Sequence, residues 1–354
     1  MRIKAIKKSP SSPSEAGQAK FKIKNVMLNL FQHLFRPRNK FGVTLRVILH
    51  FTFYIFNCLF SGCATLPKEP PKPKVYLEVP ANEYKLLVSE LVVTFIDVGQ
   101  GDSIFIKTPG GKYGLIDSGG TPYWSPSAVE PGEETVVPFL ESRKVKKLDF
   151  VIATHADGDH IGGLPAVLKR FPVGIVYENG IISDQPEYEE LHKVIDDKKI
   201  ITSVLKQGDV FDVDPSVKFE VFAPPKDFYF DGENNNAIAV RLIYGDVSFL
   251  FTADIEYEAE DSILHVYGNK IRSNIMKIGH HGSATSTSEK FLKAVNPEIA
   301  VIPVGARNNF GHPYSGVLAK LQDADINIYR TDEDGNITVR TDGKKFIIES
   351  EKNP

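Results

Sequence analysis

Short apolar runs recur along the chain from Leu91 to Thr341, and most of them end at glycine, proline or polar residues. Runs of this length that are rich in Val, Ile and Phe are typical of β-strands. The sequence Pro-Gly-Gly at residues 109–111 predicts a turn between two of them. We expect strands at residues 91–97, 103–108, 113–117, 150–153, 175–177, 219–222, 237–243, 247–252, 275–278, 299–303, 326–329 and 337–341.

Longer segments between several of these strands predict helices, which we expect at residues 134–142, 164–170, 256–267, 288–295 and 315–324. Strands that alternate with helices indicate an α/β protein. The alternation alone fits a doubly wound sheet and a pair of sheets sandwiched between helices equally well. The roughly 260 residues that follow Leu91 are enough for one large domain.

The first 62 residues differ from the rest of the chain in charge. They contain eleven Lys or Arg against one acidic residue, whereas the remainder has 31 basic and 44 acidic residues. Proteins that grip duplex DNA without sequence preference use a basic face, because neutralising phosphates supplies the binding free energy. The acidity of the remainder therefore argues against tight nonspecific binding of duplex DNA.

Residues 1–62 have the layout of a signal peptide or signal anchor. Basic residues precede an apolar stretch at 47–60, which is shorter than a typical transmembrane helix and suits the apolar region of a signal peptide. The stretch leads to Ser61, Gly62 and Cys63, which resemble the cleavage site of a bacterial lipoprotein. The alternative is an uncleaved signal anchor. Both place the domain outside the cytoplasmic membrane, and cleavage would leave Cys63 as a single, lipidated cysteine without a disulfide partner.

A proline-rich run lies within residues 63–90, and it predicts an extended tether between the membrane and the domain at residues 91–354. We therefore expect an extracytoplasmic, membrane-anchored protein.

Residues 154–163 read Thr-His-Ala-Asp-Gly-Asp-His-Ile-Gly-Gly and follow the apolar run at 150–153. Four potential metal ligands, His155, Asp157, Asp159 and His160, fall within six positions. A strand end delivers side chains to a cleft, and alternation splits these ligands between two directions, so one turn can serve two metal ions. The alternative is a polar loop with helix-capping aspartates and solvated histidines, which rarely reaches this density.

The motif His155-x-Asp157-x-Asp159-His160 resembles the His-x-His-x-Asp-His motif of the metallo-β-lactamase superfamily, with Asp157 in place of the second histidine. This form is found in the soluble metallo-hydrolase domain of the DNA-uptake (competence) protein ComEC. Further segments match that group in order, and the resemblance covers about residues 91–348. They lie at residues 95–103, 115–120, 251–254, 277–283 and 309–313. The resemblance implies an αββα sandwich of the metallo-β-lactamase type.

The resemblance also implies a centre of two divalent metal ions, Zn or Mn. Asp254 matches the bridging ligand of the superfamily. Adjacent His280 and His281 of an extended chain point apart, so one of them is a ligand and the other orients substrate or supports a ligand from behind. Of the two, we favour His281 as the ligand. The implied ligands are His155, Asp157, Asp159, His160, Asp254 and His281.

The catalytic candidates are Asp159, His280 and His312. In the resembled domain the segment Asn-Phe-Gly-His-Pro at 309–313 lies beside the metals. This position suggests that His312 donates a proton to the leaving group or contacts a phosphoryl oxygen.

Two departures from the superfamily pattern bear on the metal. Asp157 replaces an imidazole by a hard oxygen donor, and residues 194–263 contain no histidine to act as the superfamily's third-motif ligand. Both changes favour Mn²⁺ or Mg²⁺ over tightly bound Zn²⁺ and predict a weak site near His155. Residues 234–236, all Asn, either approach this centre or form an asparagine-rich turn.

These features predict an exported, membrane-tethered, dinuclear metal-dependent hydrolase of a phosphodiester, with nuclease action on DNA as in ComEC-type domains. One alternative is a cell-envelope phosphoester hydrolase such as a choline-phosphate esterase. Another is a non-catalytic envelope binding module. The expected partner is a phosphoester substrate, either single-stranded DNA or an envelope polymer, and a β-lactamase is disfavoured by Asp157.

Overall fold

The computed structural model describes residues 89–121 and 130–352. The predicted signal segment at 1–62 and almost all of the predicted tether lie outside the described residues, so both remain predictions. Within the described ranges, no helix is both long enough and apolar enough to cross a membrane.

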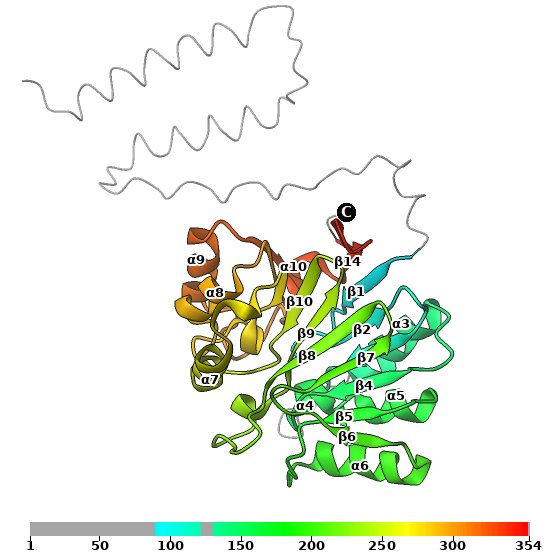
Figure 1. Cartoon of the computed structure of the whole chain (residues 1–354). Coiled ribbons are helices and arrows are strands. Elements are labelled where there is room, and N and C mark those ends of the chain that lie inside the picture. The colour runs from blue at the N-terminus through cyan, green and yellow to red at the C-terminus, as the bar shows by residue number, and fades with distance from the viewer. Residues whose placement is uncertain (1–88, 122–129, 353–354) are drawn as a thin grey trace, which may run out of the picture. The chain divides into compact units, whose positions relative to one another are not determined.

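Two β-sheets form the centre of the domain (Figure 1). The first sheet has eight strands in the order β15-β14-β1-β2-β3-β4-β5-β6. Neighbouring strands from β15 to β3 run antiparallel, whereas β3 to β6 run parallel. Its strands are β1 (Leu91–Phe95), β2 (Ile104–Lys107), β3 (Tyr113–Ile116), β4 (Phe150–Ala153), β5 (Val176–Glu178), β6 (Thr202–Val204), β14 (Ile337–Thr341) and β15 (Phe346–Ser350).

The second sheet has seven strands in the order β13-β12-β11-β10-β9-β8-β7. The strands β10 to β13 run parallel, and β7 to β10 run antiparallel. Its strands are β7 (Val210–Asp214), β8 (Val217–Ala223), β9 (Ala239–Tyr244), β10 (Val247–Phe251), β11 (Ile275–Lys277), β12 (Ile299–Ile302) and β13 (Asn327–Arg330).

Alternate residues of the central strands face two different apolar layers. Phe150 and Ile152 of β4 pack in the core between the sheets, whereas Val151 packs against the helices outside the first sheet. Similarly, Phe249 of β10 faces the core between the sheets and Leu250 faces the helices outside the second. Because both faces of each sheet are buried, the strands read as continuous apolar runs.

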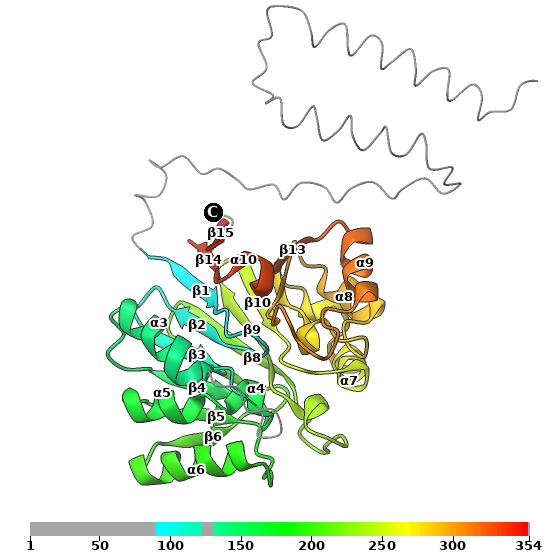
Figure 2. The same cartoon turned by 180° about the vertical axis from the view of Figure 1, so that it is seen from behind.

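Helices cover the outer face of each sheet, on opposite sides of the sandwich (Figures 1 and 2). On the first sheet lie α3 (Val137–Ser142), α5 (Leu164–Arg170) and α6 (Pro186–Lys198). On the second lie α7 (Tyr257–Tyr267), α8 (Glu289–Val295) and α9 (Ser315–Asp323). The predicted αββα sandwich is confirmed, and the doubly wound single sheet is excluded.

Several elements were not predicted from the sequence. The helix α6 is the longest of them, and it buries Leu191, Val194 and Ile195 at helical spacing after Pro186 in its first turn. That spacing was a readable signal. The strands β6, β7 and β15 and the short helices α4 (Gly158–Ile161) and α10 (Thr331–Asp334) were also missed. The predicted helix at 134–142 begins as a π-helical turn at Gly132–Val136.

The two sheets are also joined through a buried carboxylate. Asp214, at the end of β7, accepts hydrogen bonds from Thr108 Oγ1 (2.7 Å) and the Gly110 amide (2.6 Å), both in the turn after β2. Ser216 donates to its other oxygen. Burial alone would raise the pKa of Asp214, but these hydrogen bonds outweigh burial and lower it to about 2.

Candidate metal centre

The motif at residues 154–163 forms the turn between β4 and α5, with α4 in its middle. Two glycine-containing loops pack directly against its backbone. A Cβ atom added to Gly101 would lie 2.0 Å from the carbonyl oxygen of Asp159, and one added to Gly120 would lie 2.1 Å from that of Gly158. Only glycine fits at these two positions. The close packing fixes the backbone that carries the predicted ligands.

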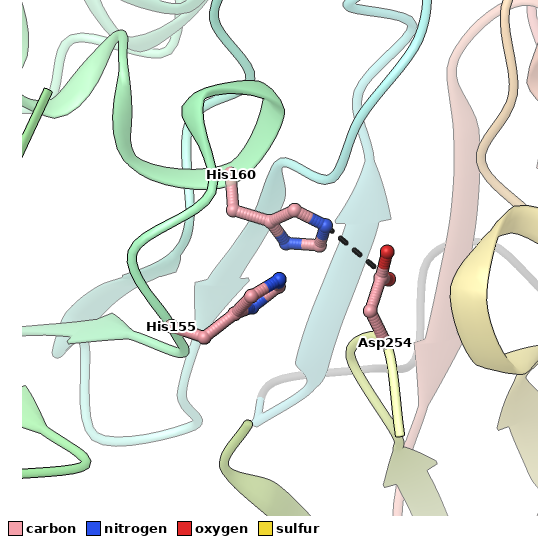
Figure 3. Close-up of side chains that lie close together, drawn as sticks. All are labelled: His155, His160 and Asp254. Carbon is pink, nitrogen blue, oxygen red and sulfur yellow. Dashed lines mark ion pairs between the residues drawn. The ribbon is translucent and has the colours of Figure 1, made fainter. Parts of the chain in front are cut away.

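The structure brings predicted ligands from both sheets into one cluster. His155, His160 and Asp254 have ligand atoms within 4.8 Å of one another, and so do Asp159, His160 and His281. Figure 3 shows the rings of His155 and His160 beside the Asp254 carboxylate. Asp254 Oδ1 lies 3.2 Å from His160 Nε2, and its Oδ2 lies 3.3 Å from His281 Nε2. One oxygen of this carboxylate therefore faces His160 and the other faces His281, and its bridging role stays a prediction.

Asp117 and Thr154 fix the orientation of two of the histidines. The Thr154 hydroxyl donates to Asp117 Oδ2 (2.6 Å), so it accepts the hydrogen bond from His155 Nδ1 at 3.0 Å. His160 Nδ1 lies 2.8 Å from the same Asp117 oxygen, a carboxylate that can only accept. Both imidazoles therefore carry their proton on Nδ1 when neutral. Neither supporting residue was assigned a role from the sequence, although Asp117 lies in a segment that carried the resemblance.

The ring of His281 is also held through Nδ1. This atom donates to the backbone carbonyl oxygen of Pro303 at 2.9 Å, so the neutral ring carries its proton on Nδ1 as well. The Nε2 atoms of His155, His160 and His281 are buried and have no hydrogen-bond partner among the described residues, although carboxylate oxygens lie nearby. Imidazoles held through Nδ1 with a free Nε2 are typical of metal ligands. The residues present therefore fit divalent metal ions.

Asp157 lies at the edge of the cluster. Its side chain is 27% exposed, its Oδ2 lies 3.5 Å from His155 Nε2, and its Oδ1 accepts a hydrogen bond from Gln185 Nε2 at 3.0 Å. By contrast, Asp254 is 2% exposed. The difference is consistent with the prediction that the position near His155 is the weaker one, which stays a prediction.

The expectation of an extended chain at His280 and His281 was wrong. Both residues have left-handed backbone, with φ of 48° and 52°, and their Nε2 atoms lie 3.6 Å and 3.3 Å from Asp254 Oδ2. The two side chains thus approach the same oxygen from different directions. His280 is 23% exposed at its side chain, and its Nδ1 lies 3.2 Å from Glu256 Oε1, whereas His281 is buried. Such backbone strain clusters at functional sites.

His312 lies at the outer side of these histidines. Its ring centroid is 5.4 Å from that of His280 and 6.4 Å from that of His281. The backbone amide of Tyr314 donates to the Gly282 carbonyl (2.8 Å), which ties this loop to the segment of His281. Partial burial and then the neighbouring imidazoles lower the pKa of His312 to about 4.

A fully buried cation, which the sequence reasoning left without a role, lies beneath Asp254. The Lys277 ammonium, at the end of β11, contacts Asp102 Oδ2 (2.7 Å), Asp254 Oδ1 (3.2 Å) and the Ala253 carbonyl oxygen (2.5 Å). Burial would lower the pKa of Lys277, but the two carboxylates outweigh burial and raise it. Lys277 therefore holds the Asp254 oxygen that faces His160, while the other oxygen faces His280 and His281.

The electrostatic balance of the cluster is negative. Burial would raise the pKa of Asp254, but His281, His160 and Lys277 lower it well below the usual range. Burial would lower the pKa of His160, but Asp254 and Asp117 raise it well above the usual range. Five aspartates, including Asp102, surround these cations. A pocket with this excess of carboxylates attracts divalent cations.

The asparagines at 234–236 mostly build local structure. Asn235 accepts a hydrogen bond from the Glu256 amide (2.9 Å), and Asn236 binds the backbone of Phe230 at both its carbonyl and amide groups. Asn234 alone approaches the centre, since its Nδ2 lies 3.5 Å from His280 Nδ1. The turn interpretation is therefore correct for two of the three residues.

Residues 96–306 match the metallo-beta-lactamase superfamily, and the chain belongs to it. Together with the sandwich of two sheets and the convergent ligand groups, this match defines the class of protein as a metallo-hydrolase of that superfamily. The resemblance inferred from the five ordered motifs is confirmed.

Among its relatives are competence proteins. The chain is 35% identical over 267 residues to ComE operon protein 3 of Bacillus subtilis and 32% identical over 247 residues to competence protein ComA of Neisseria gonorrhoeae. The alignments cover 73% and 70% of this chain but 34% and 32% of those proteins, so the chain spans about a third of their length. A solved structure, the metallo-beta-lactamase fold protein YhfI of Bacillus subtilis, is 12% identical with a TM-score of 0.48, covering 71% of this chain and 100% of that one.

Proposed function

We propose that this protein is an exported phosphodiesterase that uses two divalent metal ions and acts on single-stranded DNA. The observation that carries the proposal is the convergence of three free imidazole Nε2 atoms on the carboxylates of Asp159 and Asp254. Divalent ions held there would supply an activated water and neutralise charge on a phosphoryl group. A hard, carboxylate-rich ligand set favours Mn²⁺ over Zn²⁺.

The protein's own residues divide the remaining work. Thr154, Asp117 and the Pro303 carbonyl orient the imidazoles of His155, His160 and His281, and Lys277 keeps Asp254 in place. Without metal or substrate, burial and the imidazoles of His281 and His280 lower the pKa of His312 to about 4, so its ring is neutral at neutral pH. The neutral ring carries one N–H, which would donate to the leaving oxygen or contact a phosphoryl oxygen.

The relatives favour DNA as substrate, because one of them is named a competence protein, and competence is the uptake of DNA. The charge of the chain favours the second candidate, a choline-phosphate esterase of the cell envelope, since the 44 acidic residues beyond position 62 disfavour a polyanion. Export and membrane tethering through Cys63 are part of the proposal and rest on the sequence of residues 36–63.

The purified protein, treated with chelator and then loaded with Mn²⁺ or Zn²⁺, should be tested on bis-p-nitrophenyl phosphate, single-stranded DNA and a choline-phosphate ester. We expect metal-dependent cleavage of the first two. His281→Ala should abolish it, whereas His265→Ala, which removes an exposed imidazole on α7, should not. Cleavage of the choline-phosphate ester alone would favour the envelope esterase. Cleavage of none of the three substrates would contradict the proposed enzymatic function.

A further inference from the structure

The loop that carries His312 presents an exposed aromatic ring at the rim of the metal centre. Phe310 is 59% exposed, and its ring lies beside that of His312, with centroids 5.8 Å apart and planes inclined by 24°. The His312 ring lies in turn 5.4 Å from that of His280. A line of three rings therefore leads from the centre to solvent and ends at Phe310.

The side chain of Asn308 holds this loop in shape. Its Nδ2 donates to the carbonyl oxygens of Gly305 (2.8 Å) and His312 (2.7 Å). Its Oδ1 accepts from the backbone amides of Phe310 (3.2 Å) and His312 (3.0 Å). All four hydrogen-bonding positions of the amide are thus used within the loop. A ring fixed in this way loses little conformational entropy when a flat ligand stacks on it.

We propose that Phe310 is a stacking platform for one nucleobase of a single-stranded nucleic acid whose phosphodiester lies at the metal centre, a proposal that rests on the function proposed above. Aromatic side chains bind single strands by stacking on bases, and this contribution does not depend on a basic surface. Base stacking matters more for an acidic protein, because contacts between an acidic surface and the phosphates contribute little binding free energy.

The geometry favours a nucleobase over a quaternary ammonium group. Cations such as choline are held in cages of several aromatic faces. Among the residues that the structure describes, the ring of Phe310 has one neighbouring ring, that of His312, in a nearly parallel arrangement, and Phe310 is exposed enough for a single flat partner to stack on it. A duplex offers no such partner, because its bases are already stacked on one another.

The test compares Phe310→Ala with Phe310→Trp in the metal-loaded protein. Fluorescence anisotropy should give Kd for a short labelled single-stranded oligonucleotide and for a chain of equal length made of abasic nucleotides, both with linkages that resist hydrolysis. We expect Phe310→Ala to weaken oligonucleotide binding roughly ten-fold, about 1.4 kcal/mol, and to leave abasic binding unchanged, because the change removes one stacked base. Phe310→Trp should retain the wild-type Kd. The matched control is Phe228→Ala, since Phe228 is 51% exposed but packs edge-on against Phe230.

Failure of the stacking proposal and failure of the proposed function would give different results. An unchanged Kd in Phe310→Ala, equal losses on both chains, or an equal loss in Phe228→Ala would overturn the platform, while hydrolysis of bis-p-nitrophenyl phosphate would still support the enzyme. A wild type that cleaves no phosphodiester contradicts the proposed function, and the anisotropy comparison still reads the stacking. Weaker hydrolysis of a choline-phosphate ester by Phe310→Ala, without an effect on the oligonucleotide, would assign the ring to a cation and overturn the proposal.

Discussion

Replacing Lys277 by Met removes the buried cation of the centre without removing much volume. The ammonium contacts the Asp102 and Asp254 carboxylates and the Ala253 carbonyl, and its side chain is fully buried. Lys277→Met leaves both carboxylates without that partner in a place that water does not reach. The expected effect is therefore electrostatic, because the methionine fills most of the space of the lysine stem.

The magnitude follows from the burial of all three charges. Removing one member of a buried ion pair typically costs ~3–5 kcal/mol, since an uncompensated charge stays behind. An exposed pair contributes about 0–1 kcal/mol. Lys290, whose ammonium pairs with Asp261 between α8 and α7, offers the matched control because the lysine and aspartate side chains are 59% and 51% exposed. Lys290→Met should cost under about 1 kcal/mol.

Urea unfolding of chelator-treated protein, followed by circular dichroism and fluorescence, gives the free energy of unfolding of each variant. The double variant Lys277→Met/Asp102→Asn should be less destabilised than the sum of its single variants, because it removes both partners of one pair. A loss in Lys277→Met no larger than that in Lys290→Met would refute the reasoning. Additive losses in the double variant would show that Asp102 and Lys277 act independently.

Four further predictions concern metal, catalysis, pH and location. Asp254→Ala should lose more bound metal than Asp157→Ala by mass spectrometry, because Asp254 is buried between two ligand groups and Asp157 lies at the edge; equal losses would contradict the bridging role. His312→Ala should slow a substrate with a poor leaving group ~10²–10⁴-fold more than p-nitrophenyl phosphate diesters at unchanged metal content, and equal slowing would make it a binding residue. The pKa of Asp214 is lowered to about 2 in the folded state, so its contribution of about 2 kcal/mol is present above pH ~4 and is lost as the pH falls towards 2. Asp214→Asn should therefore destabilise the protein at pH 7 but not near pH 2, and a constant difference in urea unfolding at both pH values would exclude this linkage. Cys63→Ala should prevent incorporation of labelled fatty acid, and equal labelling of the variant would leave the signal anchor as the preferred alternative.

The sequence predicted best those features that depend on a single local pattern, either an apolar run or a dense group of polar residues. The strands and helices around the core follow from apolar runs that are buried on both faces, such as Phe150 to Ala153. The cluster of His155, Asp159 and His160 with Asp254 could be anticipated because dense His and Asp residues after a strand have few other uses. The strand β6 was missed because it is exposed, and β7 was missed because aspartates interrupt a short strand whose apolar residues are only partly buried.

The support of the centre could not be predicted from spacing. Lys277, Asp102 and Asp117 lie far apart in sequence, and only the packing of the two sheets brings them beside the ligands. The backbone at His280 and His281 was also hidden, since an apolar strand followed by His-His-Gly does not indicate two left-handed residues. The signal that was available was the position of Lys277, Asp102 and Asp117 in segments that carried the resemblance, which does not indicate the role of each one.

A titration of chelator-treated protein with Mn²⁺ tests the central claim most directly. Bound metal per chain and the rate of bis-p-nitrophenyl phosphate hydrolysis should be measured on the same samples, with Asp254→Ala beside the wild type. The account predicts that hydrolysis rises with bound metal and reaches its maximum as occupancy approaches two ions per chain, while Asp254→Ala stays inactive. Hydrolysis without bound metal, equal hydrolysis in Asp254→Ala, or full occupancy without hydrolysis would contradict it.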